Sequence, residues 1–316
     1  MGKPMQLTEK IHLIDGHDLG MEERTGSYVL MEDDITLIET SASPSVPHIL
    51  AGLKDLGLAP SDIKYIIVTH IHLDHSGGAG LLLTYCPNAK IVVHPKGQRH
   101  LANPSRLITS AKAVYREKFE ALFDPILPVP EENILVKADG ETLQISEDCV
   151  LTFHDSPGHA NHHFSIFHPG VKGLFSGDTI GIYYPQLARR GIELYIPSTS
   201  PNQFDPDKML YSIETFEQLK AERLFFGHFG MSEHPEEAYS QVKYWLEVFC
   251  STAETAFSEG SDFEERTNLA AQKLYGRVKN QLLENGLNDN DPIFELLSLD
   301  LQISSMGLID YLTRKK

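Results

Sequence analysis

Short apolar runs, each long enough for one strand, alternate with helical stretches and turns over the first two-thirds of the chain. The runs Ser27–Leu30 and Ile35–Ile38 flank a polar turn at 31–34 and indicate a hairpin. Further strands are predicted at Tyr65–Val68, Ile91–Val93, Ile134–Val136, Leu143–Ile145, Val150–Phe153, Phe164–Phe167, Leu174–Phe175 and Arg223–Phe226. Many short strands mixed with helices predict an α/β or mixed layered fold.

Helical spacing of apolar residues appears between these strands. It predicts helices at Val46–Leu56, Leu81–Tyr85 and Pro206–Leu219, and helices broken around Pro104 in the segment Lys96–Phe123.

After His234 the pattern is wholly helical. Apolar residues follow the helical period from Tyr239 to Phe257, with Trp245 expected in the core, and a second helix begins near Leu269. Two shorter helices are predicted at Ile293–Leu297 and Met306–Leu312. We therefore expect a large domain at residues 1–233 and a C-terminal helical subdomain at 234–316.

The composition limits the classes of function. The chain has 316 residues, 41% of them hydrophobic, and a formal net charge of −17, which disfavours binding to nucleic acids and to anionic membranes. No apolar run has the length of a signal peptide or a membrane span, so a soluble cytoplasmic protein is expected. Cys86, Cys149 and Cys250 form no CxxC pair, which fits a reducing compartment and suggests three small buried apolar side chains.

The segment Thr69–Gly78 carries four metal-capable side chains within six residues, directly after a predicted buried strand. His70 and His72 alternate at the strand end and project to the same side. Asp74 and His75 lie in the turn that follows and can face a second ion. Imidazole with carboxylate is a donor set for zinc, iron or manganese.

Three more candidate ligands lie just past predicted strands, where layered folds place binding sites: His159 after a Pro-Gly turn, Asp178 in the sequence Ser-Gly-Asp-Thr, and His228 between two glycines.

These motifs resemble the metallo-β-lactamase superfamily. THIHLDHSGG resembles its HxHxDH signature, and SPGHA, SGDT and GHFG resemble its later motifs in the same order. The resemblance spans roughly Thr25 to Gly230. It implies a four-layer αβ/βα sandwich with two divalent metal ions at one edge, zinc being expected and iron or manganese the alternatives. It also implies that His70, His72 and His159 bind the first ion, that Asp74, His75 and His228 bind the second, and that Asp178 bridges them.

One departure from the family pattern concerns Glu39. The sequence Leu37–Ser41 resembles a family strand that usually reads IDTG, with Glu39 in place of the Asp. Glu39 either orients a metal-binding histidine or lies on the surface.

The reaction implied is attack of a metal-bridging hydroxide on the carbonyl of an ester, thioester or lactone, with Asp74 orienting the water and moving its proton. The helical tail resembles the glyoxalase II arrangement, and could cover the active site or form a homodimer contact. The substrate is expected to be a small molecule. The alternatives are a mononuclear iron oxidoreductase of the persulfide-dioxygenase kind and a non-catalytic binding module, which the complete ligand set disfavours.

Substrate-binding candidates are few. Quorum-sensing lactonases have a Tyr three residues after the bridging Asp, where this chain has Gly181. Tyr183 and Tyr184 follow closely. We expect one of them to donate a hydrogen bond to a substrate oxygen, or both to form an aromatic wall of the pocket. His163 and His100 are further candidates for the pocket.

Overall fold

The computed structural model describes residues 2–315, and these form two compact units. Unit 1 contains the chain up to Asp155 together with His162–Gly177 and Lys220–Glu233. Unit 2 contains Ser156–Asn161, Asp178–Leu219 and the C-terminal part from His234. The expected boundary between residues 233 and 234 stays a prediction.

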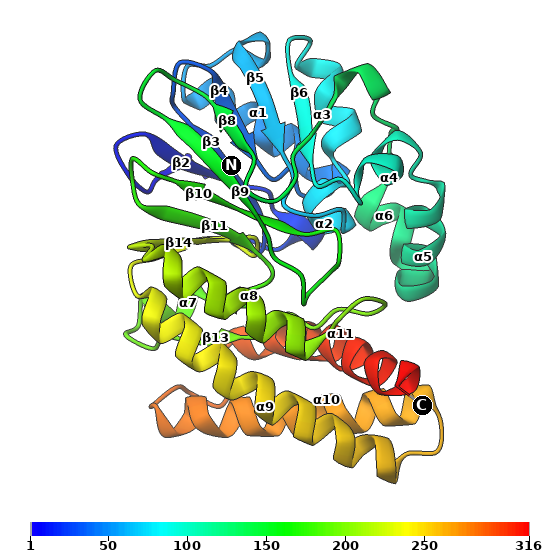
Figure 1. Cartoon of the computed structure of the whole chain (residues 1–316). Helices are drawn as coiled ribbons and strands as arrows, with labels where there is room; N and C mark the ends of the chain where they lie inside the picture. The colour runs from blue at the N-terminus through cyan, green and yellow to red at the C-terminus, as the bar shows by residue number, and fades with distance from the viewer. Residues whose placement is uncertain (1, 316) are drawn as a thin grey trace. The chain divides into compact units, whose positions relative to one another are not determined.

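Unit 1 holds two large sheets (Figure 1). In the seven-stranded sheet the order follows the chain, with antiparallel pairing from β1 to β4 and parallel pairing from β4 to β7. The predicted hairpin is confirmed as β3 and β4. The strands are β1 (Met5–Gln6), β2 (Ile11–Asp15), β3 (Gly26–Leu30), β4 (Ile35–Ile38), β5 (Ile63–Ile67), β6 (Lys90–Val93) and β7 (Ile134–Val136).

The second sheet has six strands in the order β15-β14-β11-β10-β9-β8. Only β11 and β14 pair in parallel within it. Its strands are β8 (Thr142–Gln144), β9 (Val150–Asp155), β10 (Phe164–His168), β11 (Gly173–Gly177), β14 (Arg223–Phe226) and β15 (Met231–Ser232).

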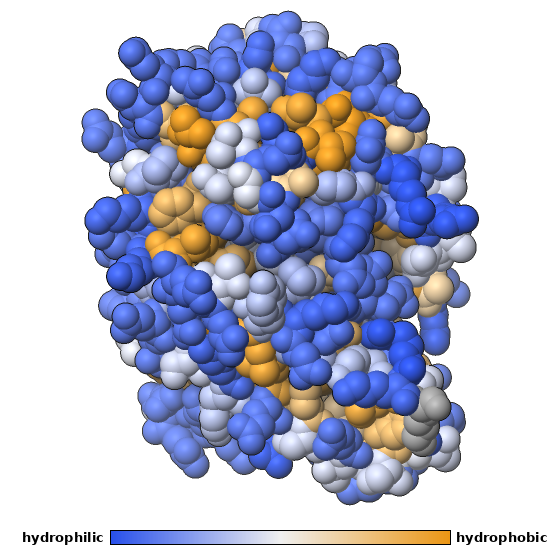
Figure 2. Space-filling view, in the orientation of Figure 1, coloured by the Kyte–Doolittle hydropathy of each residue, from blue (hydrophilic) through white to orange (hydrophobic). Residues whose placement is uncertain are grey.

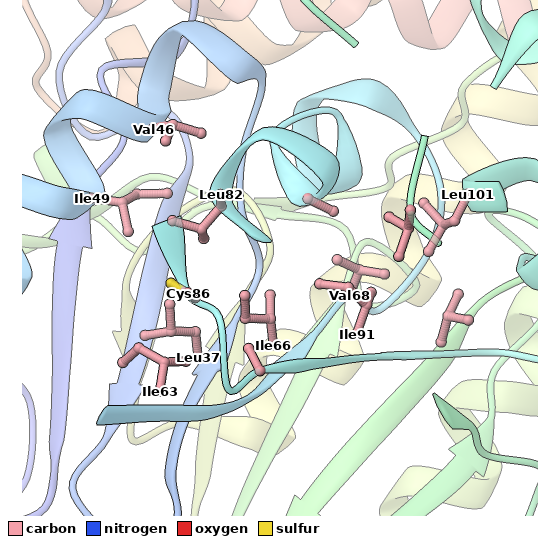
Figure 3. Close-up of a cluster of buried hydrophobic side chains, with 14 of the residues drawn as sticks. Leu37, Val46, Ile49, Ile63, Ile66, Val68, Leu82, Cys86, Ile91 and Leu101 are labelled. Atoms are coloured by element: carbon pink, nitrogen blue, oxygen red, sulfur yellow. The ribbon is translucent and has the colours of Figure 1, made fainter. Parts of the chain in front are cut away.

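Two large apolar clusters cover the faces of the seven-stranded sheet. Between the sheets, Tyr28, Ile67 and Val92 from the first sheet pack with Phe153 and Phe175 from the second. On the other face of the seven-stranded sheet, Ile49 of α1 (Val46–Asp55) and Leu82 of α3 (Ala79–Tyr85) are directed at the strand residues Ile63 and Ile66 (Figure 3). The seven-stranded sheet is therefore buried on both faces, which explains the unbroken apolar runs of β5 and β6.

The remaining helices of unit 1 are short. The predicted break around Pro104 is confirmed, because α4 ends before it and α5 starts after it. These helices are α2 (Leu73–Ser76), α4 (Gln98–Ala102), α5 (Ser105–Tyr115) and α6 (Phe119–Phe123), with 3-10 turns at Asp18–Gly20, Ser43–Ser45, Pro60–Asp62, Arg116–Lys118 and Glu131–Asn133.

Unit 2 is mostly helical. A two-stranded ribbon, β12 (Ile182–Tyr183) with β13 (Tyr195–Ile196), accompanies α7 (Pro185–Ala188) and α8 (Pro206–Leu219). The long helices α9 (Pro235–Glu259), α10 (Phe263–Glu284) and α11 (Ile293–Arg314) pack against one another (Figure 1). Trp245 is buried in α9, as predicted.

The prediction of two short helices near the C-terminus is wrong, because α11 runs unbroken through both segments. Small polar residues interrupt the apolar period there, yet Ser304 and Ser305 are buried. They face a close backbone contact: Thr199 donates a hydrogen bond to the Ser304 carbonyl at 2.8 Å, and a Cβ on Gly307 would lie 1.9 Å from the Thr199 oxygen. In the middle of the helix, the buried residues are therefore small rather than apolar, because small residues allow this close contact.

Hydrophilic residues dominate the face shown in Figure 2, with scattered apolar patches between them. This agrees with the acidic composition. Among residues 2–315, no helix combines the length and the apolar character that a bilayer crossing requires.

Candidate metal centre

The segment from Thr69 to His75 is fixed by the end of β5 and by the turn that follows. The Val68 amide still donates to the Val92 carbonyl at 3.0 Å, so the chain leaves the sheet only at Thr69. His72 has extended backbone angles immediately before α2, and His75 lies in that short helix. The Thr40 amide and hydroxyl both donate to the His75 carbonyl, each at 2.9 Å, and this anchors the turn.

His70 and His72 present ring nitrogens to each other: Nε2 of His70 lies 3.1 Å from Nδ1 of His72. The Thr69 hydroxyl donates to Oε1 of Glu39 in a very short hydrogen bond, and it lies 3.0 Å from Nδ1 of His70. Since its proton is directed at Glu39, the hydroxyl accepts from Nδ1–H of His70. That tautomer leaves the lone pair on Nε2 of His70 directed at His72, as a metal ligand requires.

A second set of donors adjoins the first. Oδ2 of Asp74 lies 3.7 Å from Nε2 of His75 and 3.7 Å from Nε2 of His228. The His75 ring is centred 4.2 Å from the ring of His70, so the two sets are neighbours within unit 1.

His228 lies in the turn between β14 and β15. The Tyr28 hydroxyl is 2.6 Å from the Phe226 carbonyl and 2.7 Å from the Gly230 carbonyl, the two sides of that turn. The φ angle of Gly230 is +94°, a conformation that favours glycine. The predicted placement of a histidine just past the last long strand therefore depends on a buried tyrosine from β3.

Glu39 is buried, so the surface interpretation of this residue is wrong. Its Oε1 lies 3.6 Å from Nδ1 of His75, and it accepts the Thr69 hydrogen bond at the same oxygen. Glu39 thus lies beside His75 of one donor set and binds Thr69, which contacts His70 of the other.

Unit 2 brings together the other two predicted ligands. Nε2 of His159 lies 3.6 Å from Oδ2 of Asp178. Nδ1 of His159 donates to the Ser198 carbonyl at 2.9 Å, and the Ser198 hydroxyl donates to Oδ2 of Asp178 at 3.0 Å. Ser198 therefore sets the tautomer of His159 and the orientation of Asp178 at once. The Ser200 hydroxyl lies 3.2 Å from Nε2 of His159.

The donor sets fit a divalent metal of the zinc type. Two nitrogen or oxygen ligands on one tetrahedral zinc ion, each at about 2.0–2.1 Å, lie about 3.3 Å apart. The donor pairs of unit 1 lie 3.1 and 3.7 Å apart, and that of unit 2 lies 3.6 Å apart. Imidazole and carboxylate groups buried together would otherwise carry a large desolvation cost.

Comparison with known proteins identifies the family. The model of the metallo-beta-lactamase superfamily matches residues 22–228, which is more than half of the chain. The chain belongs to the metallo-beta-lactamase superfamily. The predicted fold class, an α/β sandwich of this family with a C-terminal helical region, is confirmed.

Individual relatives of this superfamily are distant in sequence. The metallo-beta-lactamase fold-containing protein ST1585 of Sulfurisphaera tokodaii is 25% identical over 75% of this chain and 87% of its own length. An N-acyl homoserine lactonase of Bacillus thuringiensis is 27% identical over 56% of this chain and 60% of its own length. A metallo-beta-lactamase family protein of Thermus thermophilus superposes with a TM-score of 0.70 at 18% identity, covering 98% of this chain and 95% of that one. This last similarity shows the fold alone.

The four predicted substrate residues have different surroundings. His163 is buried with its ring centred 4.9 Å from that of His70, whereas His100 lies on α4 with its Nε2 bonded to Arg99. The Tyr184 hydroxyl donates to Asp300 of α11 at 2.9 Å, which favours a structural role. Tyr183 stacks on Tyr195 at 5.3 Å, and burial raises its pKa to about 12. These two observations favour the interpretation of Tyr183 as part of an aromatic wall over a role as a proton donor.

Sequence reasoning missed Asp18 and Arg24, a buried ion pair with a 3.4 Å separation. Burial raises the pKa of Asp18 to about 6, Arg24 opposes that shift, and the charge of Asp74 adds to it. Both residues lie in an irregular stretch with no motif, so the only signal was the density of charge in an otherwise turn-like segment. Ser198 was also missed, because it lies in an irregular segment with no motif.

Proposed function

We propose that this chain is a dinuclear metal-dependent hydrolase that attacks the carbonyl of an ester, thioester or lactone. The observation that carries the proposal is the pair of adjoining donor sets in unit 1: His70 with His72, and Asp74 with His75 and His228. By the family's motif order, His159 would complete the first set and Asp178 would bridge the two. When bound, two divalent ions would supply a hydroxide near neutral pH and polarise the carbonyl oxygen.

Side chains of the protein would orient the attacking water and the metal ligands. Asp74 is only partly buried, with 23% of its side chain exposed, and it would orient the attacking water and accept its proton. Glu39 and Thr69 would hold His70 and His75 in place, and Ser198 would do the same for His159.

Lactones are the substrate class that the relatives favour, because several matched proteins are named N-acyl homoserine lactonases. The substrate would be a small molecule, and the −17 net charge disfavours a nucleic acid. A cytoplasmic location and a homodimer remain expectations from the sequence.

The test is elemental analysis of the purified full-length chain, combined with turnover of a lactone and thioester panel. At least two metal ions per chain are expected. His72→Ala should lose metal and turnover together, and Asp74→Asn should reduce kcat by roughly 10²–10⁴-fold. His234→Ala is the matched control, because this exposed histidine pairs with Glu193 instead.

Two results would overturn the proposal. One is a single iron per chain with oxygen uptake on a thiol substrate, which would establish the persulfide-dioxygenase alternative. The other is full turnover in the metal-depleted His72→Ala variant.

A further inference from the structure

A second cluster of metal-capable side chains lies in unit 1, formed by Glu32, Cys149 and His168. All three are buried. Sγ of Cys149 lies 3.4 Å from Nε2 of His168, and that nitrogen lies 3.8 Å from Oε1 of Glu32. One donor atom from each residue lies within 4.8 Å of the other two.

The cluster lies at the opposite strand ends from the candidate metal centre. In the seven-stranded sheet, Glu32 lies two residues past the end of β3, whereas Glu39 directly follows the last residue of the antiparallel neighbour β4. In the six-stranded sheet, Cys149 precedes β9 and His168 ends β10, whereas His163 precedes β10. The cluster therefore connects both sheets of unit 1 at their other end.

The geometry differs from that of a proton relay. In a Cys-His-acid relay, sulfur and carboxylate contact opposite nitrogens of the imidazole. Here the sulfur lies 3.4 Å from Nε2 and 3.9 Å from Nδ1 of His168, and the carboxylate oxygen lies 3.8 Å from Nε2, which is too long for a hydrogen bond. One donor atom of each residue instead lies within 4.8 Å of the other two.

The separations match those of ligands on one zinc ion. With Zn–S near 2.3 Å and Zn–N or Zn–O near 2.0–2.1 Å, tetrahedral geometry places sulfur and nitrogen about 3.6 Å apart and nitrogen and oxygen about 3.3 Å apart. The observed 3.4 and 3.8 Å differ from these values by about half an ångström or less.

Lys10 is a charged neighbour that opposes a cation here. Its Nζ donates to Oε2 of Glu32 at 2.7 Å, which leaves Oε1 directed at His168. Its side chain is 53% exposed, so water screens its charge. With Cys149 ionised, the carboxylate and thiolate together still outweigh the single ammonium.

We propose that Glu32, Cys149 and His168 form a binding site for a divalent transition metal of the zinc type, which ties the end of β3 to the β9–β10 hairpin. Burial, followed by the charge of Glu32, raises the pKa of the Cys149 thiol to about 11, so at neutral pH the thiol keeps its proton unless a metal ion binds the sulfur. Binding forms a metal–sulfur bond and releases that proton to solvent. This site goes beyond the proposed function, and neither depends on the other.

The test is a Co²⁺ titration of the metal-stripped full-length chain, followed by absorption spectroscopy. The candidate metal centre offers only nitrogen and oxygen donors, so a thiolate-to-cobalt charge-transfer band reports a cysteine ligand. The band is expected in the wild type and lost in Cys149→Ser. It should persist in His72→Ala and in the matched control Cys250→Ser, whose half-buried thiol lies on α9 of unit 2.

A second variant guards against misfolding. His168→Gln keeps the thiol, and the cobalt concentration that half-saturates the band should rise at least about 10-fold. Circular dichroism confirms that each variant is folded. A wild-type chain that binds cobalt without the band, or a Cys149→Ser or His168→Gln variant that keeps it unchanged, would show that the cluster is only a thiol–imidazole hydrogen bond and would overturn the proposal.

Discussion

Oε1 of Glu39 lies 3.6 Å from Nδ1 of His75, and both side chains are buried. The same oxygen accepts the hydrogen bond from Thr69, whose hydroxyl contacts Nδ1 of His70. A single carboxylate thus supports one histidine from each donor set of unit 1. The φ angle of Glu39 is +70°, an uncommon conformation for a non-glycine residue, which shows that the surrounding contacts fix it.

Glu39→Gln is therefore expected to weaken metal binding without removing a ligand. The neutral amide attracts Nδ1–H of His75 less strongly than the carboxylate does. Loss of such a supporting partner typically lowers the affinity for the metal by about 10–100-fold. Competition with a chromogenic chelator measures the change. Glu120→Gln, at an exposed position of α6, is the control and should bind metal like the wild type. Equal chelator resistance in both variants would mean that Glu39 does not support the ligands.

The grouping of the donor side chains of unit 1 could be predicted because their signals are local. His70 and His72 follow a buried apolar strand, and strand alternation places them on one side. His228 follows the last long strand in the same way. Such information lies within a few residues of each ligand.

The supporting contacts could not be predicted, because they join segments that are far apart in the sequence. Ser198 reaches His159 and Asp178 from an irregular segment with no periodicity. Cys149 precedes β9 and His168 ends β10, and the β9–β10 pairing and the end of β3 bring them to Glu32. In the same way, the close contact at Gly307 explains why α11 does not follow an apolar period.

Gly158, before His159, is a position where only glycine fits. Its φ is +133°, and a Cβ there would lie 2.4 Å from Cα of Met209, which is backbone and cannot rotate away. Gly158→Ala should destabilise the chain by about 1–3 kcal/mol or more, through backbone strain and the clash. The urea midpoint measures this. Gly276→Ala is the control: it has no atom within 4 Å of its Cβ and lies in helix α10, so a gain of about 0.5–1 kcal/mol is expected. A Gly158→Ala midpoint equal to that of the wild type would contradict the strain.

Asp155 makes stability depend on acid pH. The Lys96 amide donates to Nδ1 of His94, so Nε2–H of His94 donates to Oδ1 of Asp155 at 3.0 Å, and this bond lowers the pKa of the Asp155 carboxyl. A carboxyl with a lowered folded-state pKa stabilises the fold above its unfolded value near 3.8, and that contribution is lost as the pH falls through the folded value.

Asp155→Asn should therefore be less stable than the wild type at pH 6 by less than about 1 kcal/mol, because the carboxylate is 42% exposed and screened. The difference should vanish as the pH drops well below about 4. Urea midpoints at both pH values measure it, and exposed Asp55→Asn should show no such change. A stability difference between Asp155→Asn and the wild type that grows as the pH falls would contradict this prediction.

Tyr184 is the residue for which structure and sequence suggest different roles. Its buried hydroxyl donates to the buried Asp300 carboxylate at 2.9 Å, within unit 2. Tyr184→Phe removes a donor from a buried charge, which should cost about 1–3 kcal/mol of stability. Turnover of the best panel substrate per folded chain should stay unchanged. Tyr244→Phe, at a side chain that is 58% exposed, should alter neither quantity. A Tyr184→Phe variant of normal stability whose kcat/KM falls about 10-fold, or about 1.4 kcal/mol in transition-state binding, would return this hydroxyl to the substrate.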